Sequence, residues 1–255
     1  MTSEETTTAP ASTRRDSVIA TTLLGVLTEV GFLGAGVASY LAVRWYTLGS
    51  TDEAISNTGD VLRLERLLGL DWEHAIQDAT LAVPGLSAFL TQIYVWGYLP
   101  ALVGITLWLH VRHRETYTTM RNALLASGAL GLVVYALYPC APPWIGGAGG
   151  FADTVAEGSF ATVARPPGIT NHLGAIPSFH VGWVILAGVV VLRVAHSRTL
   201  RVLCVVYPVL MGCAVISTGN HWVLDIPAGA GLAAIGLLVA SLLTRTSQRG
   251  RRRPE

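Results

Sequence analysis

Long apolar blocks separated by polar segments dominate the hydrophobic pattern of this chain. Within each block the apolar residues run almost continuously, and a block of about 18 or more can cross a bilayer as a helix. The pattern predicts an all-α integral membrane bundle of six transmembrane helices. The third to fifth blocks are shorter, which a thinned bilayer or interfacial Trp and Tyr residues can accommodate. The six predicted helices lie at residues 18–43, 88–110, 122–138, 180–194, 200–216 and 222–243.

The segments between these helices differ in character. Residues 61–81 carry apolar side chains at helical spacing with charges between them, which predicts an amphipathic helix on the outer surface. Residues 139–179 are rich in Gly and Pro and form a loop long enough to line a site. We expect a disordered cytoplasmic tail at 1–16, a six-helix membrane domain that carries the chemistry at 17–244 and a basic cytoplasmic tail at 245–255.

Composition and charge support a membrane protein and predict its orientation. Of the 255 residues, 51% are hydrophobic and 13% are charged, which excludes an ordinary soluble domain. The six-helix arrangement places thirteen of the seventeen arginines on the side of the two termini, and the chain has no lysine. The positive-inside rule therefore predicts cytoplasmic termini, with the loops at about 44–87, 139–179 and 217–221 facing outward.

The segment GNHWVLD, at the outer end of the last predicted helix, contains a histidine and an acid four residues apart. On a helix, His221 and Asp225 would share one face. A carboxylate just inside hydrocarbon needs a partner, and His221 is within reach. A carboxylate that accepts the proton of one imidazole nitrogen leaves the other nitrogen free to attack and stabilises the cation formed. The pair predicts a histidine nucleophile and its orienting acid.

The segment AIPSFHVGW places Ser178 and His180 at the start of the fourth predicted helix. Unpaired amides at a helix start, with the Ser178 hydroxyl, can hold a phosphate near His180, which would act as general acid on the leaving oxygen. We count Asn220, beside His221, with Ser178 among the phosphate-binding residues. Either histidine alone would be taken as a packing residue, so the hypothesis rests on their joint placement at outer helix ends.

The succession of PSFH and GNHWVLD resembles the second and third motifs of the type 2 phosphatidic acid phosphatase superfamily. The segment APPW at 141–144 and the form AIPSFHVGW are similar to the branch that contains the inositol phosphorylceramide synthases. The resemblance runs from about residue 62 to 238 and implies six transmembrane helices, no metal or other cofactor, and a covalent phosphohistidine intermediate. It implies His221 as nucleophile, Asp225 as its support, and His180 as acid and then base.

Two departures from the family pattern remove basic residues that would bind phosphate. Gly158 stands seven residues before Arg165-Pro166, where the first motif has a lysine, and Val215 stands where the third motif has an arginine. We predict that Arg165 replaces them, because its loop leads directly to His180 and a guanidinium can bind two phosphate oxygens at once.

Other polar residues near the outer face are not included in the predicted site. We interpret Arg63 and Arg66 as surface residues that pair with nearby acids, and we leave Arg44, His172 and the intramembrane acid Glu29 outside the predicted site. The acids within reach of the two surface arginines are Asp60, Glu65 and Asp71.

These features together predict a membrane-embedded, metal-independent lipid phosphatase or phosphotransferase at the outer face of the cell membrane. Its expected partners are a lipid phosphate and the bilayer, with no nucleic acid, and the sequence specifies neither the lipid nor the oligomeric state. Transfer of a phosphoryl headgroup to an alcohol, as in an inositolphosphotransferase, is the alternative to hydrolysis. Two further hypotheses are a non-catalytic lipid-binding or transport protein, and a metal enzyme with His180, His221 and Asp225 as ligands.

Overall fold

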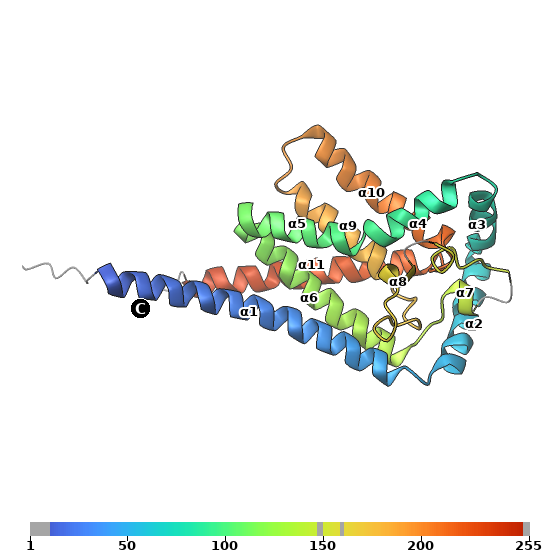
Figure 1. Ribbon diagram of the computed structural model, residues 1–255, viewed down its shortest axis with the longest axis horizontal. Helices are drawn as coiled ribbons and strands as arrows, with labels where there is room; N and C mark the ends of the chain where they lie inside the picture. Colours follow the sequence, from blue (N-terminus) through green and yellow to red (C-terminus); the bar gives the residue numbers. More distant parts are fainter. Residues whose placement is uncertain (1–10, 147–149, 159–160, 252–255) are drawn as a thin grey trace, which may run out of the picture. The chain divides into compact units, whose positions relative to one another are not determined.

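The computed structural model describes residues 11–146, 150–158 and 161–251. The described chain is helical and contains no β-strand, and an isolated bridge pairs Cys140 with Gly174. Figure 1 labels the helices as they are named below. They are α1 (Ala11–Tyr46), α2 (Thr51–Leu68), α3 (Glu73–Leu81), α4 (Leu86–Trp96), α5 (Leu99–Arg112), α6 (Arg114–Leu137), α7 (Pro143–Gly146), α8 (Ala161–Ala164), α9 (Phe179–Leu192), α10 (Arg198–Ser217) and α11 (Asp225–Arg251).

The chain divides into two compact units, Met1–Leu41 and Ala42–Glu255. The described part of the first unit is a single helix, the greater part of α1. Because α1 begins at Ala11, helix covers the end of the predicted tail at 1–16, and residues 1–10 of that tail lie outside the described residues. At the other end α11 continues to Arg251, and residues 252–255 of the predicted basic tail also lie outside the described residues.

Several helices are long and apolar enough to cross a membrane. The bent pair of α3 and α4, at 116° to each other, adds one span if its halves form a single broken one. α5 and α9 are apolar but shorter, with 14 residues each. The prediction of an all-helical, multi-pass membrane protein is confirmed, whereas six spans remain a prediction. The four long segments are Leu23–Tyr46, Arg114–Leu137, Arg198–Ser217 and Asp225–Thr246.

The second predicted helix, at 88–110, is broken into α4 and α5. Gly97 follows the end of α4, and Pro100 lies in the first turn of α5, where a missing N–H is tolerated. The Tyr207 hydroxyl of α10 donates to the Gly97 carbonyl at 2.7 Å and occupies the space that a Cβ at position 97 would need. The apolar run therefore forms two helices because glycine and proline interrupt it at a close contact with α10.

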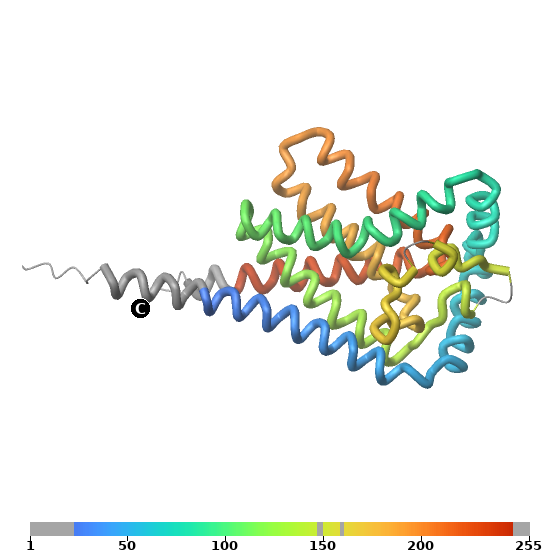
Figure 2. Tube along the Cα trace, viewed as in Figure 1, coloured from blue at the N-terminus to red at the C-terminus, as the bar shows by residue number. Residues whose placement is uncertain are grey.

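The second unit is built around α11, which packs against α6 and α9, while α10 packs against α9 and α4. The ribbon in Figure 1 and the tube in Figure 2 show α6, α9 and α11 passing close to one another. A Cβ on Gly182 of α9 or Gly229 of α11 would overlap backbone of the opposing segment, so small residues permit this approach. The contact brings the starts of α9 and α11 together, and Ser178 N donates to Asp225 O at 3.1 Å.

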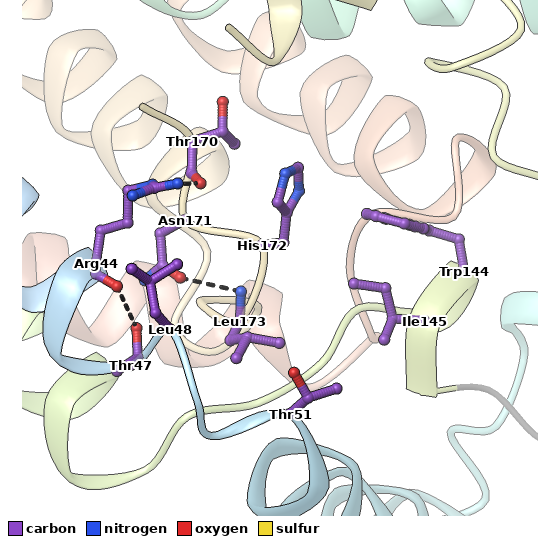
Figure 3. Close-up of a pocket in the computed structure, with 10 residues that line it drawn as sticks. All are labelled: Arg44, Thr47, Leu48, Thr51, Trp144, Ile145, Thr170, Asn171, His172 and Leu173. Carbon is purple, nitrogen blue, oxygen red and sulfur yellow. Dashed lines mark hydrogen bonds between the residues drawn. The ribbon is translucent and has the colours of Figure 1, made fainter. Parts of the chain in front are cut away.

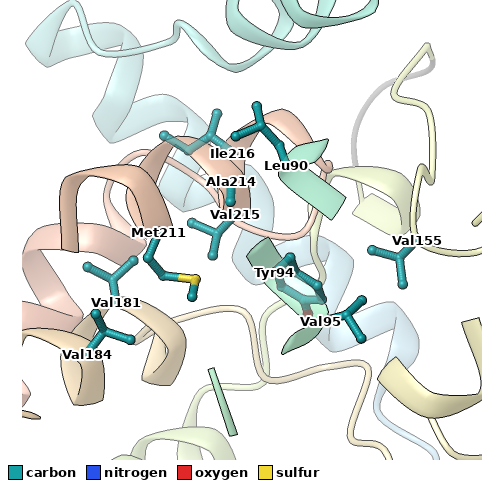
Figure 4. Packing of buried hydrophobic residues seen from close by; sticks show 10 residues of the cluster. All are labelled: Leu90, Tyr94, Val95, Val155, Val181, Val184, Met211, Ala214, Val215 and Ile216. Carbon is teal, nitrogen blue, oxygen red and sulfur yellow. The ribbon is translucent and has the colours of Figure 1, made fainter. Parts of the chain in front are cut away.

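An apolar cluster lies between α4, α9 and α10, next to these helix starts (Figure 4). Tyr94 of α4 and Met211 of α10 are both buried in it. The cluster fixes α4 against α10, which itself packs against α9, and so determines which residues of α4 face the site. Its members are Leu90, Tyr94, Val95, Val155, Val181, Val184, Met211, Ala214, Val215 and Ile216.

The segment at 61–81, predicted as one amphipathic helix, is divided between α2 and α3. Gly69 ends α2 in the left-handed region, with φ 67°, and Leu70 N donates to the Glu65 carbonyl at 2.8 Å. One face of α2 is buried against the protein, in particular against the chain that follows α6. That face consists of Ala54, Thr58, Val61 and Glu65.

Candidate active site

His221 lies in the turn between α10 and α11, residues 218–224, which we call the His221 turn. α11 begins only at Asp225, so the prediction that His221 and Asp225 share a helical face is wrong. The two side chains still meet, because the carboxylate of Asp225 folds back over the turn that precedes α11. Its Oδ2 lies 3.0 Å from His221 Nδ1 and accepts the Trp222 N–H at 2.9 Å. The His221 and Asp225 side chains are 5% and 0% exposed.

Gly219 sets the path of the chain into this turn. Its φ of 71° lies in the left-handed region, and a Cβ there would press on Ala152 O and the Gln77 side chain. Gln77 Nε2 donates to Ser217 O at 3.1 Å and to Ala152 O at 3.0 Å. α3 therefore holds the end of α10 and the loop that carries Asp153 in one arrangement.

The second nitrogen of His221 faces the start of α9. Nε2 lies 3.3 Å from Ser178 Oγ, and that oxygen caps α9 by accepting the Val181 N–H at 3.4 Å. The ring centroids of His180 and His221 are 5.7 Å apart, at an interplanar angle of 63°. The structure thus brings Ser178, His180 and His221 together with Asp225, and their roles remain predictions.

Two tyrosines, which the sequence analysis did not identify, enclose the His180 ring. The centroid of Tyr94 lies 4.4 Å from that of His180, and the centroid of Tyr98 lies 4.1 Å away. Both come from the interrupted segment of α4 and α5, so the break at Gly97 contributes to the shape of the site. Their four-residue spacing within an apolar run was the signal that could have identified them. Among the described residues, no group of three or more His, Cys, Asp or Glu side chains is placed to hold a metal ion.

Arg165 follows the short helix α8 and reaches the His221 turn. Its guanidinium donates to Asp153 Oδ2 at 2.6 Å and to the Asn220 side-chain oxygen, next to His221. The guanidinium carbon also lies 4.5 Å from the centre of the Trp144 ring, in a cation–π contact. With its side chain 11% exposed, Arg165 is nearly buried beside the two histidine motifs. Asn220 is held from its other end, since its Nδ2 donates to Thr218 Oγ1 at 2.8 Å.

The other arginines predicted to face outward are placed differently. Arg63 pairs with Asp60 at 3.3 Å with its side chain 73% exposed, and Arg66 Nε donates to Leu62 O on its own helix. Their interpretation as surface residues agrees with these contacts. Val215, at the position of the family's arginine, is buried in the apolar cluster of Figure 4. Among the described outward arginines, Arg165 is the one bonded to the His221 turn.

Glu65 and Glu73, on α2 and α3, reach the His221 turn from outside the bundle. Glu65 Oε1 accepts the Leu224 N–H at 2.8 Å and Glu73 Oε1 accepts the Val223 N–H at 2.7 Å. Both residues are buried, with 0% and 2% of their surface exposed. The sequence analysis assigned Glu65 to surface pairing, which is wrong. The available signal was its position on the apolar face of α2, in step with Ala54, Thr58 and Val61.

A cavity of about 250 Å³ is lined on one side by Trp144, the residue whose ring Arg165 contacts (Figure 3). Arg44 closes one end by donating from Nε to Thr170 O at 3.0 Å. The His172 ring faces the Trp144 ring edge-on, with centroids 5.6 Å apart. Partial burial lowers the pKa of His172, and the charges of Arg165 and Arg44 lower it further. The cavity thus has a cationic and hydrogen-bonding lining with no acidic side chain among its lining residues.

Comparison with known proteins identifies the family. The sequence pattern of the PAP2 superfamily matches residues 59–239, which is more than half of the 255 residues and includes both histidine motifs. The chain therefore belongs to the PAP2 superfamily, the type 2 phosphatidic acid phosphatases, and the family predicted from the motifs is confirmed.

Two individual proteins are similar to the chain. A phosphoinositol dihydroceramide synthase of Bacteroides thetaiotaomicron is 25% identical over 158 residues, which are 56% of this chain and 51% of that protein. The chain thus spans about half the length of this relative. The crystal structure of Aquifex aeolicus LpxE has a TM-score of 0.50 and 18% identity, covering 67% of this chain and 93% of that one. At this identity the structural likeness shows a shared fold.

Proposed function

We propose that this protein is a membrane-embedded, metal-independent enzyme that cleaves a lipid phosphate ester through a phosphohistidine at His221. The observation that carries the proposal is the orientation of His221: Nδ1 is bonded to the buried Asp225, while Nε2 points to Ser178 at the start of α9. Membership of the PAP2 superfamily supports the same chemistry. The His180 ring lies close enough to share one phosphoryl group with His221.

The first half-reaction begins at Nε2 of His221. Asp225 accepts a hydrogen bond from the Nδ1–H group, so the lone pair on Nε2 attacks phosphorus, and the carboxylate stabilises the imidazolium cation that results. The Nε2–P bond forms as the bond to the lipid oxygen breaks, and His180 gives its proton to that oxygen. In the second half-reaction His180 takes a proton from water or an alcohol, whose oxygen attacks phosphorus and releases His221.

Arg165, Ser178 and Asn220 hold the phosphate in this mechanism. A guanidinium has several N–H donors, and Arg165 keeps others for phosphate while it is bonded to Asp153 and Asn220. The free amides at the start of α9, beside Ser178, add donors of fixed direction. These groups would stabilise the charge that develops on the phosphoryl oxygens in the transition state.

Transfer to an alcohol is the second candidate, and the cavity beside Trp144 favours it. Its 250 Å³ can receive a polar group next to the phosphate site, and its lining of Arg44, His172 and Thr170 offers hydrogen bonds. The similarity to a phosphoinositol dihydroceramide synthase supports the same reaction type. The distribution of arginines supports placing both termini in the cytoplasm and the site at the outer membrane face.

The test is release of inorganic phosphate by detergent-purified protein from phosphatidate, isoprenyl phosphate and phosphoinositide, with EDTA present. Each lipid is assayed with and without inositol as acceptor, and new phosphoesters are separated by chromatography. We expect His221→Ala to reduce turnover by at least about a thousandfold. The matched control is His196→Ala, at an exposed position between α9 and α10, which should leave turnover unchanged.

Each competing hypothesis predicts a different outcome of this assay. Turnover that survives in His221→Ala would contradict the histidine mechanism, and turnover abolished by EDTA would indicate a metal enzyme. Lipid binding without turnover on any substrate, with or without inositol, would indicate the non-catalytic bundle. New phosphoester in place of free phosphate would identify a transferase.

A further inference from the structure

Three consecutive amides of the His221 turn each donate to a carboxylate. The Trp222 N–H donates to Asp225, the Val223 N–H to Glu73 and the Leu224 N–H to Glu65. The two glutamates lie 150 and 159 residues earlier in the sequence, on two different helices. The amides of residues just ahead of a helix have no acceptor within that helix, and at Val223 and Leu224 these distant side chains supply the acceptors.

We propose, resting on the function proposed above, that Glu65 and Glu73 are positioning residues for phosphoryl transfer: Glu65 is protonated beside Glu73, and the two together fix the His221 turn so that His221 faces the phosphate. Neither glutamate touches the histidine. They act through the backbone at Val223 and Leu224, which joins the nucleophile to Asp225.

A proton is needed because three acids, Glu65, Glu73 and Asp225, lie close together around the turn. Glu65 and Glu73 are both buried and accept the N–H groups of two adjacent residues, Leu224 and Val223, so their carboxyls lie close together and repulsion favours a proton on one of them. Glu65 Oε2 is buried and receives no hydrogen bond from any described donor, whereas Oε1 accepts the Leu224 N–H. Oε2 is therefore the oxygen that carries the proton.

The surroundings of Glu65, outside the membrane-spanning segments, agree with this assignment. Burial raises the pKa of the Glu65 carboxyl to about 8, opposed by the Leu224 N–H and reinforced by the nearby Glu73 and Asp225. The segment after α6 contributes the Cys140 thiol, whose own pKa is raised to about 12 by burial and which therefore stays neutral. On α2 itself, Arg63 is turned to solvent and pairs with Asp60.

Loss of this proton would disturb the site. Three ionised carboxylates around one short turn repel one another, so Glu65 and Glu73 would separate and release their amides. The His221 turn would then lose the bonds that hold it against α2 and α3. We expect phosphoryl transfer to weaken as the pH rises through about 8.

The experiment compares Glu65→Gln with Glu65→Leu on the full-length protein in detergent. Glutamine keeps an acceptor for the Leu224 N–H and a neutral donor toward Glu73, but it cannot ionise. We expect Glu65→Gln to retain kcat at pH 7 and to lack the decline that the wild type shows above pH 8. Glu65→Leu should lower kcat by about tenfold to a hundredfold with KM little changed, because the nucleophile is displaced while the phosphate groups stay in place.

Glu53→Gln, at an exposed position on the same helix, is the matched control and should behave as the wild type. An alkaline decline that persists unchanged in Glu65→Gln would overturn the assignment of the proton. Full kcat in Glu65→Leu would overturn the positioning role. If Glu65→Leu fails to fold, the pH profile of Glu65→Gln decides the proposal.

Infrared spectroscopy provides a readout that does not depend on turnover. The protonated carboxyl of Glu65 should give a carbonyl band at pH 7 that disappears above about pH 8 and is missing in Glu65→Gln. Absence of this band in the wild type would overturn the proposal even if the enzyme is active. Presence of the band in a protein without His221-dependent turnover would contradict the proposed function while leaving the protonated Glu65 established.

Discussion

The His221 turn and the described residues around Arg165 border the same site, but the protein holds them in different ways. Three buried carboxylates bind successive amides of the turn, and two of them come from α2 and α3. Arg165 is held by Asp153, by Asn220 and by the face of Trp144, next to a cavity of about 250 Å³. The comparison indicates that the group expected to react is fixed from several directions, while the groups expected to select the substrate lie where a ligand can enter.

Replacing one acid in each region by its amide gives the largest expected difference in kcat. Asp225→Asn replaces the acceptor of His221 Nδ1 with an amide, which favours the wrong tautomer, so kcat should fall by about a thousandfold to ten-thousandfold. Asp153→Asn leaves His221 untouched and should change KM more than kcat, because it only loosens Arg165. Steady-state kinetics on one lipid phosphate check both variants. Equal losses of kcat would show that the two regions are held as a single unit.

The next largest effect is expected at Arg165. Arg165→Lys keeps the positive charge but loses the planar fork, so kcat/KM should fall by about tenfold to a hundredfold, consistent with charged hydrogen bonds worth about 1.5–3 kcal/mol. Arg63→Lys, on the exposed face of α2, is the control and should have no effect. Wild-type kcat/KM in Arg165→Lys would mean that Arg165 is structural and that phosphate charge is met elsewhere.

The raised pKa of Glu65, beside the His221 turn, predicts that the free energy of unfolding depends on pH. The Glu65 carboxyl titrates near 4.5 when unfolded and near 8 in the fold, so between these values the folded chain keeps a proton that the unfolded chain has released. The free energy of unfolding should therefore fall as the pH rises from 4.5 to 8 and be level above that window. Thermal unfolding in detergent should show Tm lower by about 5 °C or more at pH 8 than at pH 5, a drop that is reduced in Glu65→Gln. The same slope in both proteins would assign the effect to another group.

The smallest effect on kinetics is expected from a substitution in the cavity beside Trp144. Because the pKa of His172 is lowered, its ring is neutral at pH 7 and acts there through hydrogen bonding alone. His172→Gln keeps a hydrogen-bonding side chain and should change KM for a lipid with a polar headgroup by about threefold or less, near the net value of one neutral hydrogen bond. Turnover of a small phosphate ester without a headgroup should be unchanged. A fall in kcat on the small ester would instead place His172 at the reacting phosphate.

Much of the architecture follows from local sequence patterns. The apolar blocks correspond to α1, α6, α9, α10 and α11, since a continuous apolar run of sufficient length has few stable forms other than a membrane helix. The two histidine motifs identified the family, because each carries its functional side chains within a few residues. Arg165 was chosen as the basic partner from its loop alone, and the structure places it against Asn220 of the His221 turn.

The errors share one physical cause. The helical register proposed for His221 and Asp225 followed from their spacing, but the chain forms a turn there, with Gly219 in the left-handed region and the Val223 and Leu224 amides bonded to Glu73 and Glu65, and α11 starts only at Asp225. The second predicted helix was expected to be continuous, although contact between Gly97 and Tyr207 of α10 accompanies its interruption. In each case a contact between distant parts of the chain altered what the local pattern favoured.

The sequence alone determined that this is a helical membrane protein of the PAP2 superfamily with two histidine motifs, because hydrophobicity and motif spacing are properties of neighbouring residues. Only the tertiary structure decided which acids hold the His221 turn and which aromatic rings enclose His180. Glu65 and Glu73 resemble surface residues until α2 and α3 fold against the His221 turn. Their burial then makes each charged or unpaired oxygen costly, which favours binding to the amides of the turn and a protonated Glu65.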